Sequence, residues 1–174
     1  MDETAQFSLR EFNDLPGDSA RQVLLNCCPA RRWADELVSA RPYACADELL
    51  ARSAQAVTGL EPDDLRQALS GHPRIGAPEP AGQAHRAAGG WSGQEQSGVD
   101  RADQELMQAL AAGNRAYEQR FGHIYLVCAT GRSGAELLDL LQARLGHDPA
   151  AEWRVVAAEL EKINRIRLRK LIEG

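Results

Sequence analysis

Signals that start and stop α-helices recur along this chain, and they constrain its fold more than any other feature. Ser8 and Glu11 have the spacing of a capping box, in which each residue bonds the other's backbone, and Ser133 and Glu136 repeat it. Proline and glycine residues end most of the apolar patterns between these signals. The patterns predict one helix after Ser8, one capped by Asp18, and others over residues 31–40, 47–57, 61–70, 92–121, 133–145 and from 148 onward.

One short segment, residues 123–130 (HIYLVCAT), has the β-branched and aromatic content of a strand. No second convincing strand is available to pair with it, so we interpret it as a buried extended connection or an irregular helix. Alanine and leucine are abundant, whereas aromatic residues make up only 5% of the chain. We therefore expect an all-α fold, and the length of 174 residues fits one compact multi-helix domain over residues 1–174.

Residues 71–90 (GHPRIGAPEPAGQAHRAAGG) are rich in Gly, Pro and Ala and poor in large apolar side chains. Loops of this length are either functional or disordered. Neither flanking part is long enough to stand well alone, so we do not place a domain boundary here. The sequence predicts that this long loop bears the functional site.

Charge and hydropathy exclude several classes of function. The net charge of −5 is spread over interspersed acids and bases, which argues against a nucleic-acid partner. No apolar run is long enough to span a membrane, and the acidic, polar N-terminal segment does not resemble a secretory signal. The four cysteines lack the spacing of a zinc site, and no metal site is expected. We expect free, mostly buried thiols and a cytoplasmic location.

His72 stands directly before Pro73, just after a predicted helix end. A residue before proline is excluded from the helical region, so the imidazole is held at a defined angle. Its ordinary pKa of roughly 6.5 suits proton transfer near neutral pH. The alternative is a helix-ending dipeptide whose ring caps a backbone carbonyl.

Two further segments have both a functional and a structural interpretation. Ser92 and Glu95 have capping-box spacing, yet a Ser, a Glu and a Gln beside exposed helix N-terminal amides also form a corner that recognises anions and amides. Residues 120–125 (RFGHIY) are typical of a helix end followed by a core segment, and they can also offer backbone groups to a ligand.

Taken together, these segments resemble the signature of the OHCU decarboxylase family. OHCU is 2-oxo-4-hydroxy-4-carboxy-5-ureidoimidazoline, the second unstable intermediate between urate and allantoin. The similarity covers nearly the whole chain. Its pieces are FNDLP at 12–16, HPRIG at 72–76, S-x-x-E-Q at 92–96, NRAYEQRFG at 114–122, the stretch from Arg144-Leu145 to Glu152, and EKINRIRLRKL at 161–171.

The resemblance implies an all-helical homodimer that acts on OHCU without a metal or organic cofactor. His72 would be the catalytic proton donor, and Glu95 would bond the 4-hydroxyl group or a ring N–H and influence the charge of His72. Arg167 would bind the substrate carboxylate. The other implied substrate contacts are Pro73, Ser92, Gly93, Gln94, Glu95, Gln96, Phe121, Gly122, His123, Ile124 and Tyr125. The sequence departs from the family at His123-Ile124-Tyr125, where apolar residues are more usual.

The implied chemistry makes sense of a protein without a cofactor. Loss of CO₂ leaves an electron pair that needs a sink, and in OHCU the C=N bond next to the carboxyl-bearing carbon is that sink. The protein must then hold the ring, turn the carboxylate out of its plane and protonate one face, which gives (S)-allantoin. Two alternatives stay open: a non-catalytic helical module that docks through residues 71–90, and another ureide-processing enzyme that uses the same His72 and Glu95 pair.

Overall fold

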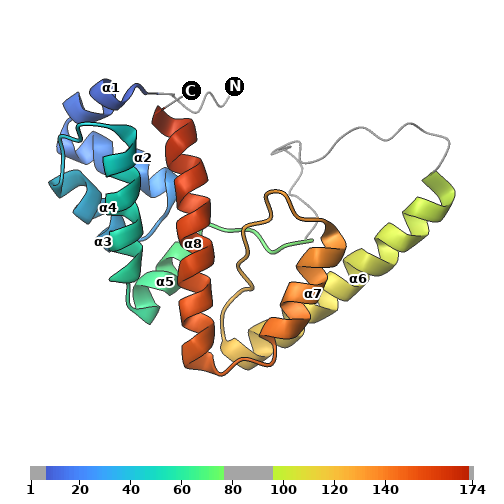
Figure 1. Ribbon diagram of the computed structural model, residues 1–174. Coiled ribbons are helices and arrows are strands. Elements are labelled where there is room, and N and C mark those ends of the chain that lie inside the picture. Colours follow the sequence, from blue (N-terminus) through green and yellow to red (C-terminus); the bar gives the residue numbers. More distant parts are fainter. Residues whose placement is uncertain (1–6, 77–95, 173–174) are drawn as a thin grey trace. The chain divides into compact units, whose positions relative to one another are not determined.

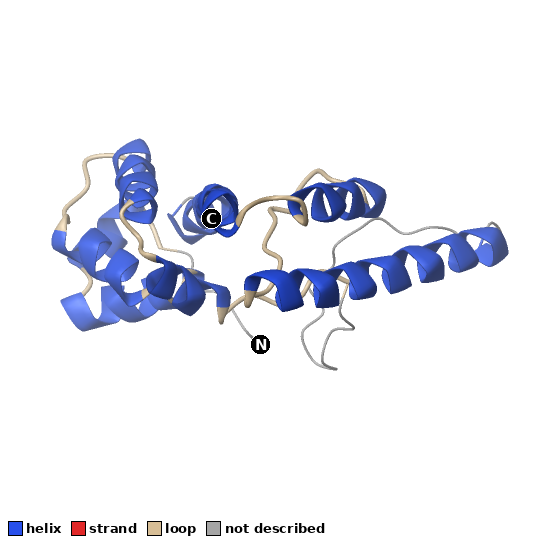
Figure 2. Cartoon of the chain, turned by 90° about the horizontal axis from the view of Figure 1, so that it is seen from below, coloured by secondary structure: helices blue, strands red, loops and turns tan. Residues whose placement is uncertain are grey.

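The computed structural model describes residues 7–76 and 96–172, with side chains in the second range described from residue 103 onward. These residues form eight helices and no strand, so the predicted all-α class is confirmed (Figures 1 and 2). The helices are α1 (Leu9–Asp14), α2 (Gly17–Cys27), α3 (Arg31–Ser39), α4 (Ala46–Thr58), α5 (Pro62–Leu69), α6 (Gln96–Phe121), α7 (Gly134–Arg144) and α8 (Pro149–Ile172).

The predicted capping boxes begin two of these helices. The Ser8 N–H donates to the Glu11 carboxylate at 2.7 Å, and the Glu11 N–H donates to the Ser8 hydroxyl at 3.3 Å. Ser133 and Glu136 make the same pair of bonds at the start of α7. The prediction that Asp18 caps the second helix is wrong, because α2 begins one residue earlier, after Pro16. Asp18 instead lies in the first turn, where the helix dipole favours a carboxylate.

The segment that resembled a strand is an irregular, buried connection. Residues 124–128 have no regular secondary structure, and Tyr125, Leu126, Val127 and Cys128 are all buried. This confirms the interpretation made from the lack of a partner strand. Among the described residues, no helix has both the length and the hydropathy that crossing a membrane requires.

The chain divides into two compact units. The first comprises Met1–His72, Leu126–Cys128 and Asp148–Gly174, and the second comprises Pro73–Tyr125 and Ala129–His147. The interpretation as a single domain over residues 1–174 stays a prediction.

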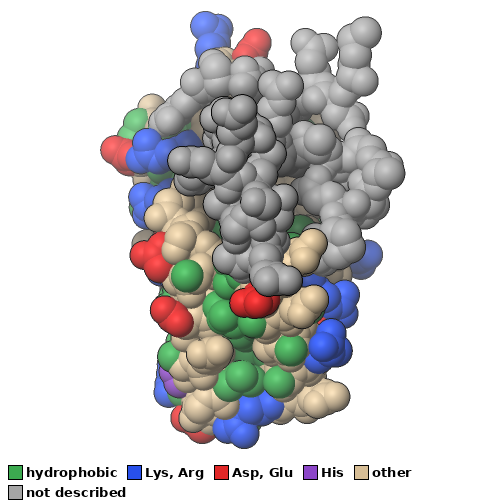
Figure 3. All heavy atoms as spheres, turned by 90° about the vertical axis from the view of Figure 1, so that its right-hand side faces the viewer, with side chains coloured by type: hydrophobic (Ala, Val, Ile, Leu, Met, Phe, Trp, Pro, Cys, Tyr) green, Lys and Arg blue, Asp and Glu red, His purple; other side chains and the backbone are tan. Residues whose placement is uncertain are grey.

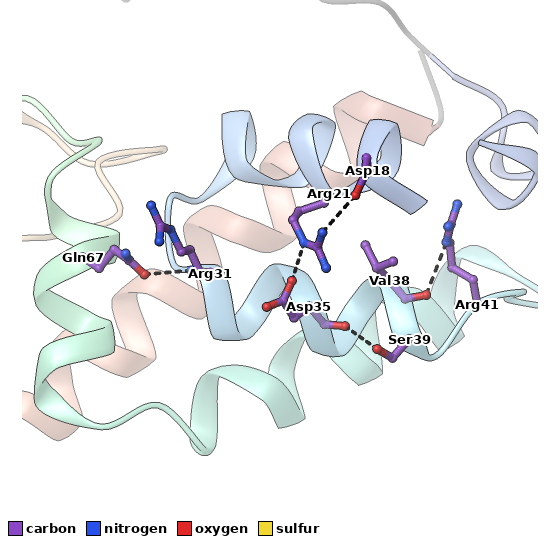
Figure 4. Close-up of polar contacts among 8 residues, drawn as sticks. All are labelled: Asp18, Arg21, Arg31, Asp35, Val38, Ser39, Arg41 and Gln67. Atoms are coloured by element: carbon purple, nitrogen blue, oxygen red, sulfur yellow. Dashed lines mark hydrogen bonds and ion pairs between the residues drawn. The ribbon is translucent and has the colours of Figure 1, made fainter. Parts of the chain in front are cut away.

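In the first unit, α8 packs against α4, α4 packs against α3, and α3 packs against α2 (Figure 1). Trp33 is fully buried in this core, and its indole N–H donates to the Ser53 hydroxyl at 3.0 Å. At the surface Arg21 of α2 bonds Asp35 of α3 at 2.5 Å (Figure 4). Other fully buried side chains of this unit are Phe12, Leu24, Leu37, Leu49, Leu160 and Leu168.

In the second unit, α6 and α7 pack closely because two glycines face leucines. A Cβ atom added at Gly113 of α6 would lie 2.6 Å from a methyl carbon of Leu141, and one added at Gly134 of α7 would lie 2.6 Å from a methyl carbon of Leu106. On the face drawn in Figure 3, apolar side chains lie among acidic and basic ones. Met107, at 43% exposure, is the one large apolar side chain that is exposed in the described part of the chain.

Candidate functional site

His72 follows the end of α5 and lies in a tightly packed backbone segment. Its N–H donates to the carbonyl of Leu69 at 3.0 Å, which continues the turn beyond the helix. A Cβ atom at the preceding Gly71 would lie 2.8 Å from the ring of Pro29, so only glycine fits this approach to the end of α2. Local packing before His72 and the restriction from Pro73 after it therefore fix the direction of its side chain.

The His72 imidazole contacts Arg167 of α8, which is 95 residues later in the sequence. One guanidinium nitrogen of Arg167 lies 3.4 Å from Nδ1 of His72, and another donates to the carbonyl of Cys27 at 2.5 Å. Arg167 therefore links the end of α2 to the residue that follows α5. The structure brings together these two predicted site residues.

This contact determines which ring nitrogen of His72 carries the proton. A guanidinium has only donors, so Nδ1 of His72 must act as the acceptor and the neutral ring carries its hydrogen on Nε2. Nε2 is buried and has no hydrogen-bond partner among the described residues. The alternative in which the ring caps a backbone carbonyl is therefore not what the described residues show. Within residues 7–76 and 96–172, the N–H donor of the imidazole has no partner.

Burial, and secondly the positive charge of Arg167, lower the pKa of His72 from 6.5 to about 4. Both effects disfavour the charged imidazolium form. A pKa of about 4 makes the neutral form of His72 the favoured one near physiological pH.

Burial disfavours the thiolate form of the two thiols near this pair, Cys27 and Cys28. Burial raises the pKa of Cys27 to about 11, although the charge of Arg167 acts in the opposite direction. Burial also raises the pKa of Cys28. Burial therefore favours the protonated form of both thiols, which is the less nucleophilic form. Cys128 is buried as well, whereas Cys45 is exposed, and all four are free as predicted.

Asn164 is a residue near Arg167 that sequence reasoning missed. It lies one helical turn before Arg167 on α8 and is fully buried, and neither atom of its carboxamide has a hydrogen-bond partner among the described residues. Its amide lies beside the Cys28 thiol and acts to lower the pKa of that thiol, against the larger effect of burial. A polar residue on the apolar face of the last helix was the available signal.

The predicted contacts from Phe121 to Tyr125 lie in the second unit, where His123 and Tyr125 are buried while Phe121 and Ile124 are partly exposed. The Phe121 and His123 rings pack on Tyr117, with centroids 4.6 and 5.4 Å away. Nδ1 of His123 lies 3.0 Å from the Ile124 carbonyl. The Tyr125 hydroxyl donates to the carbonyl of Leu137 at 3.2 Å.

Gly122 has a positive φ of 73°, and its N–H donates to the Glu118 carbonyl at 2.9 Å, the geometry of a helix C-cap. The helix C-cap that the sequence predicted at Gly122 is therefore present, and the functional interpretation of residues 120–125 stays a prediction. The side chains of His123 and Tyr125 are buried in this packing, and the substrate contacts of residues 121–125 stay a prediction.

The remaining predicted residues are located only in part. Ser92, Gly93, Gln94 and Glu95 lie outside the described residues, and Gln96 begins α6 without a described side chain. Pro73 is exposed and begins the second unit. Both interpretations of Glu95 therefore stay open. In the described ranges, no group of three or more His, Cys, Asp and Glu side chains could hold a metal ion.

An open groove of about 700 Å³ lies on α3, α4 and α5 and contains none of the predicted site residues. Arg32 is 3.5 Å from Asp64, and Arg52 is 3.5 Å from Glu36, so its charges largely neutralise one another. Figure 4 shows one edge, where Gln67 accepts the Arg31 N–H at 2.8 Å. The groove does not resemble an anion site. Its lining residues are Arg31, Arg32, Asp35, Glu36, Ser39, Ala40, Arg52, Asp64 and Gln67.

Comparison with known proteins identifies one relative that the chain matches over nearly its whole length and others that are longer than this chain. The chain is 29% identical over 171 residues to 2-oxo-4-hydroxy-4-carboxy-5-ureidoimidazoline decarboxylase of Amia calva, covering 95% of this chain and 94% of that protein. It is 28% identical over 146 residues to the uric acid degradation bifunctional protein TTL of Arabidopsis thaliana, covering 83% of this chain. The chain spans 45% of the length of that plant protein.

Solved structures show the same fold. A crystal structure of OHCU decarboxylase in the presence of (S)-allantoin matches with a TM-score of 0.68 and 27% identity, covering 86% of this chain and 96% of that one. A crystal structure of (S)-allantoin synthase matches with a TM-score of 0.67 over 95% of this chain and 54% of that one, and at 17% identity it supports the fold alone. The family model described as OHCU decarboxylase matches residues 13–169. Because this match takes in nearly all of the sequence, the chain belongs to the OHCU decarboxylase family.

Proposed function

We propose that this chain decarboxylates OHCU to (S)-allantoin in urate degradation. The observation that carries the proposal is the pairing of His72 with Arg167 in a member of this family. The imidazole has a buried Nε2–H with no partner in the described part of the chain, and a guanidinium lies against its other nitrogen. A proton donor next to a carboxylate-binding cation is what the decarboxylation of an anionic imidazoline requires.

Arg167 binds the substrate carboxylate and in doing so changes the charge of His72. An anion at the guanidinium offsets the positive field that helps to keep the pKa of His72 near 4. It also draws the guanidinium away from Nδ1 of His72, which lies 3.4 Å from it in the structure. Nδ1 can then take up a proton, and the resulting imidazolium is able to donate from Nε2.

The steps balance as one proton consumed for each CO₂ released. The bond to the carboxylate breaks, CO₂ leaves, and the electron pair forms a ring C=C bond while the nitrogen of the former C=N bond takes up a proton. The 4-hydroxyl group then loses its proton and becomes a carbonyl, and the adjacent ring carbon receives a proton from Nε2 of His72. Because His72 is held on one side, that carbon is protonated on one face.

The other predicted residues have supporting roles in this proposal. Glu95 bonds the 4-hydroxyl group or a ring N–H, while Ser92 and the amides of Gly93, Gln94 and Gln96 hold the ureido and ring oxygens. Pro73 and the backbone of residues 121–125 complete the contacts. No cofactor is required, because the substrate contains its own electron sink. The proposal includes a homodimer, from the resemblance, and a cytoplasmic location as the default.

The test uses OHCU generated freshly by urate oxidation, with optical rotation and release of CO₂ followed together. Spontaneous decay of OHCU is slow and gives racemic allantoin, so the protein should accelerate CO₂ release and produce a rotation of a single sign. A non-catalytic interaction module would leave both signals at their spontaneous rates. A different ureide-processing enzyme would consume OHCU without releasing CO₂ in equal amount. Either result would reject the proposed function.

A further inference from the structure

The three residues after Pro73 lie along a single stripe of α6. Arg74, Ile75 and Gly76 contact Glu118, Asn114 and Leu110, respectively. These α6 residues are four positions apart, so they lie one above another on one face of the helix. The segment and the helix therefore run in opposite directions, and each residue of the segment meets a successive turn.

Two of these contacts are polar and well formed. The Arg74 guanidinium makes a two-pronged ion pair with the Glu118 carboxylate, with N···O distances of 2.5 and 2.9 Å. The Asn114 side-chain amide, on a residue only 5% exposed, donates to the Ile75 carbonyl at 2.7 Å. A two-pronged arginine–carboxylate pair fixes orientation as well as distance. A buried amide donor that lost this carbonyl would be left unsatisfied.

The third contact is steric. Gly76 has a positive φ of 76°, and a Cβ atom there would lie 3.3 Å from Cβ of Leu110. A larger residue would therefore be strained by its backbone conformation and crowded by α6. All three residues after Pro73 are matched to the helix in different ways.

We propose that Glu118 and Asn114 are positioning residues for the reaction, because they anchor on α6 the backbone that directly follows His72-Pro73. This inference rests on the proposed function of His72. Few rotatable bonds separate the anchored residues from the imidazole. Proline fixes its own φ and restricts the residue before it, so a displacement of Arg74 is passed on to the peptide of His72.

The conservative variant Glu118→Gln tests this inference. It keeps the shape of the side chain and removes the charge that orients Arg74. We expect kcat per folded molecule to fall roughly tenfold, since small displacements of a proton donor are costly, while the melting temperature changes little. The excess of (S)-allantoin should fall with kcat as the spontaneous, racemic decay takes a larger share.

Glu161→Gln is the matched control. Glu161 also pairs with an arginine, Arg165 at 3.1 Å, and its side chain is 27% exposed against 28% for Glu118. Loss of this ion pair should leave kcat and product configuration unchanged. A purely structural role for Glu118 predicts that both variants behave alike.

Arg74→Gln and the double variant with Glu118→Gln test whether the pair acts as a unit. The double variant should be no slower than either single variant if both remove the same constraint. Exchange of the charges, Arg74→Glu with Glu118→Arg, should restore part of kcat. Additive losses, or a Glu118→Gln kcat within about twofold of the parent, would overturn the inference.

A measurement that does not depend on turnover keeps this inference separate from the proposed function. The pKa of His72, lowered to about 4, can be followed by NMR of the ring C–H signals. A loosened ring gains water, so its pKa should move toward 6.5 in Glu118→Gln and not in Glu161→Gln. An unchanged pKa in Glu118→Gln would refute the positioning role even if the parent chain proved inactive on OHCU.

Discussion

Replacement of Arg167 by methionine should both weaken substrate binding and change the titration of His72. In the structure Arg167 makes two contacts, with the Cys27 carbonyl and with Nδ1 of His72. The bond to Cys27 fixes the guanidinium, so under the proposed function little ordering of Arg167 is needed when the substrate binds. Methionine keeps the length of the stem and removes the charge and every donor.

The magnitude follows from the charged hydrogen bond that Arg167 is proposed to make with the substrate carboxylate. A hydrogen bond to a charged group contributes about 1.5–3 kcal/mol, which corresponds to a loss of roughly 10- to 150-fold in kcat/KM. Most of it should appear as a higher KM, because the carboxylate partner acts before CO₂ leaves. Arg165→Met is the matched control, since Arg165 lies on the same helix but pairs with Glu161 at the surface.

The titration of His72 should shift by only part of its perturbation. Burial is the larger cause of its low pKa and Arg167 the smaller one, so removal of the charge should raise the pKa above about 4 but leave it below 6.5. Arg167→Lys keeps the charge but loses the planar fork, so the pKa of His72 should stay low while KM remains high.

Steady-state kinetics and NMR titration of the ring C–H signals together decide the matter. Unchanged KM and kcat in Arg167→Met would show that Arg167 does not meet the substrate. An unchanged pKa of His72 would show that the contact with Nδ1 has no electrostatic consequence. Either result would refute the corresponding half of the reasoning.

Three other variants or treatments test the remaining roles. His72→Asn should lose roughly 10²- to 10⁴-fold in turnover, and a loss below tenfold would remove it from proton transfer. Because the folded state resists proton uptake by His72, the parent should lose stability as the pH falls from 6.5 to 4. In chemical denaturation, His72→Asn should lose less free energy of unfolding over this range, by at most about 3 kcal/mol. Identical pH profiles of the two proteins would contradict this. Activity should survive exhaustive chelation, and recovery of lost activity by one divalent metal would disprove it. Glu95→Gln should lower turnover about 100-fold or more with little change in melting temperature, whereas near-normal turnover would reduce Glu95 to a capping-box residue.

Local signals predicted the fold well because the helices of this chain are delimited by local chemistry. The capping boxes at Ser8 and Ser133 depend on residues three apart, so sequence alone identifies them. The segment over 123–130 was interpreted correctly because the sequence contains no second convincing strand, and a strand needs a partner. Asp18 failed as a cap because a first-turn carboxylate and an N-cap have similar sequence signals.

The site was predictable only where a constraint is local or a family motif carries it. Sequence alone identifies the His72-Pro73 dipeptide, because proline restricts the backbone of the residue before it. Sequence alone does not identify Arg167 as the partner of His72, because it is 95 positions away and only the packing of α8 brings it near. The resemblance supplied Arg167 as a carboxylate partner, but not its contact with Nδ1. Asn114 and Glu118 appeared in the NRAYEQRFG motif without an assigned role until their contacts with Ile75 and Arg74 were seen.

The pairing of His72 with Arg167 also suggests how the proton donor is prepared and reset. In the proposed mechanism, binding of the carboxylate offsets the field at the imidazole and releases Nδ1, so the pKa rises and His72 takes up a proton. Once CO₂ has left, the product is uncharged, and the guanidinium is free to return to Nδ1 and lower the pKa again. An anionic, unreactive analogue that keeps the carboxylate should therefore raise the pKa of His72 well above about 4, while (S)-allantoin should leave it close to that value. Titration of the ring signals with each ligand at saturation measures this difference. Equal pKa values in the two complexes would mean that the carboxylate does not control the charge of His72, and that the proton reaches the ring carbon by another route.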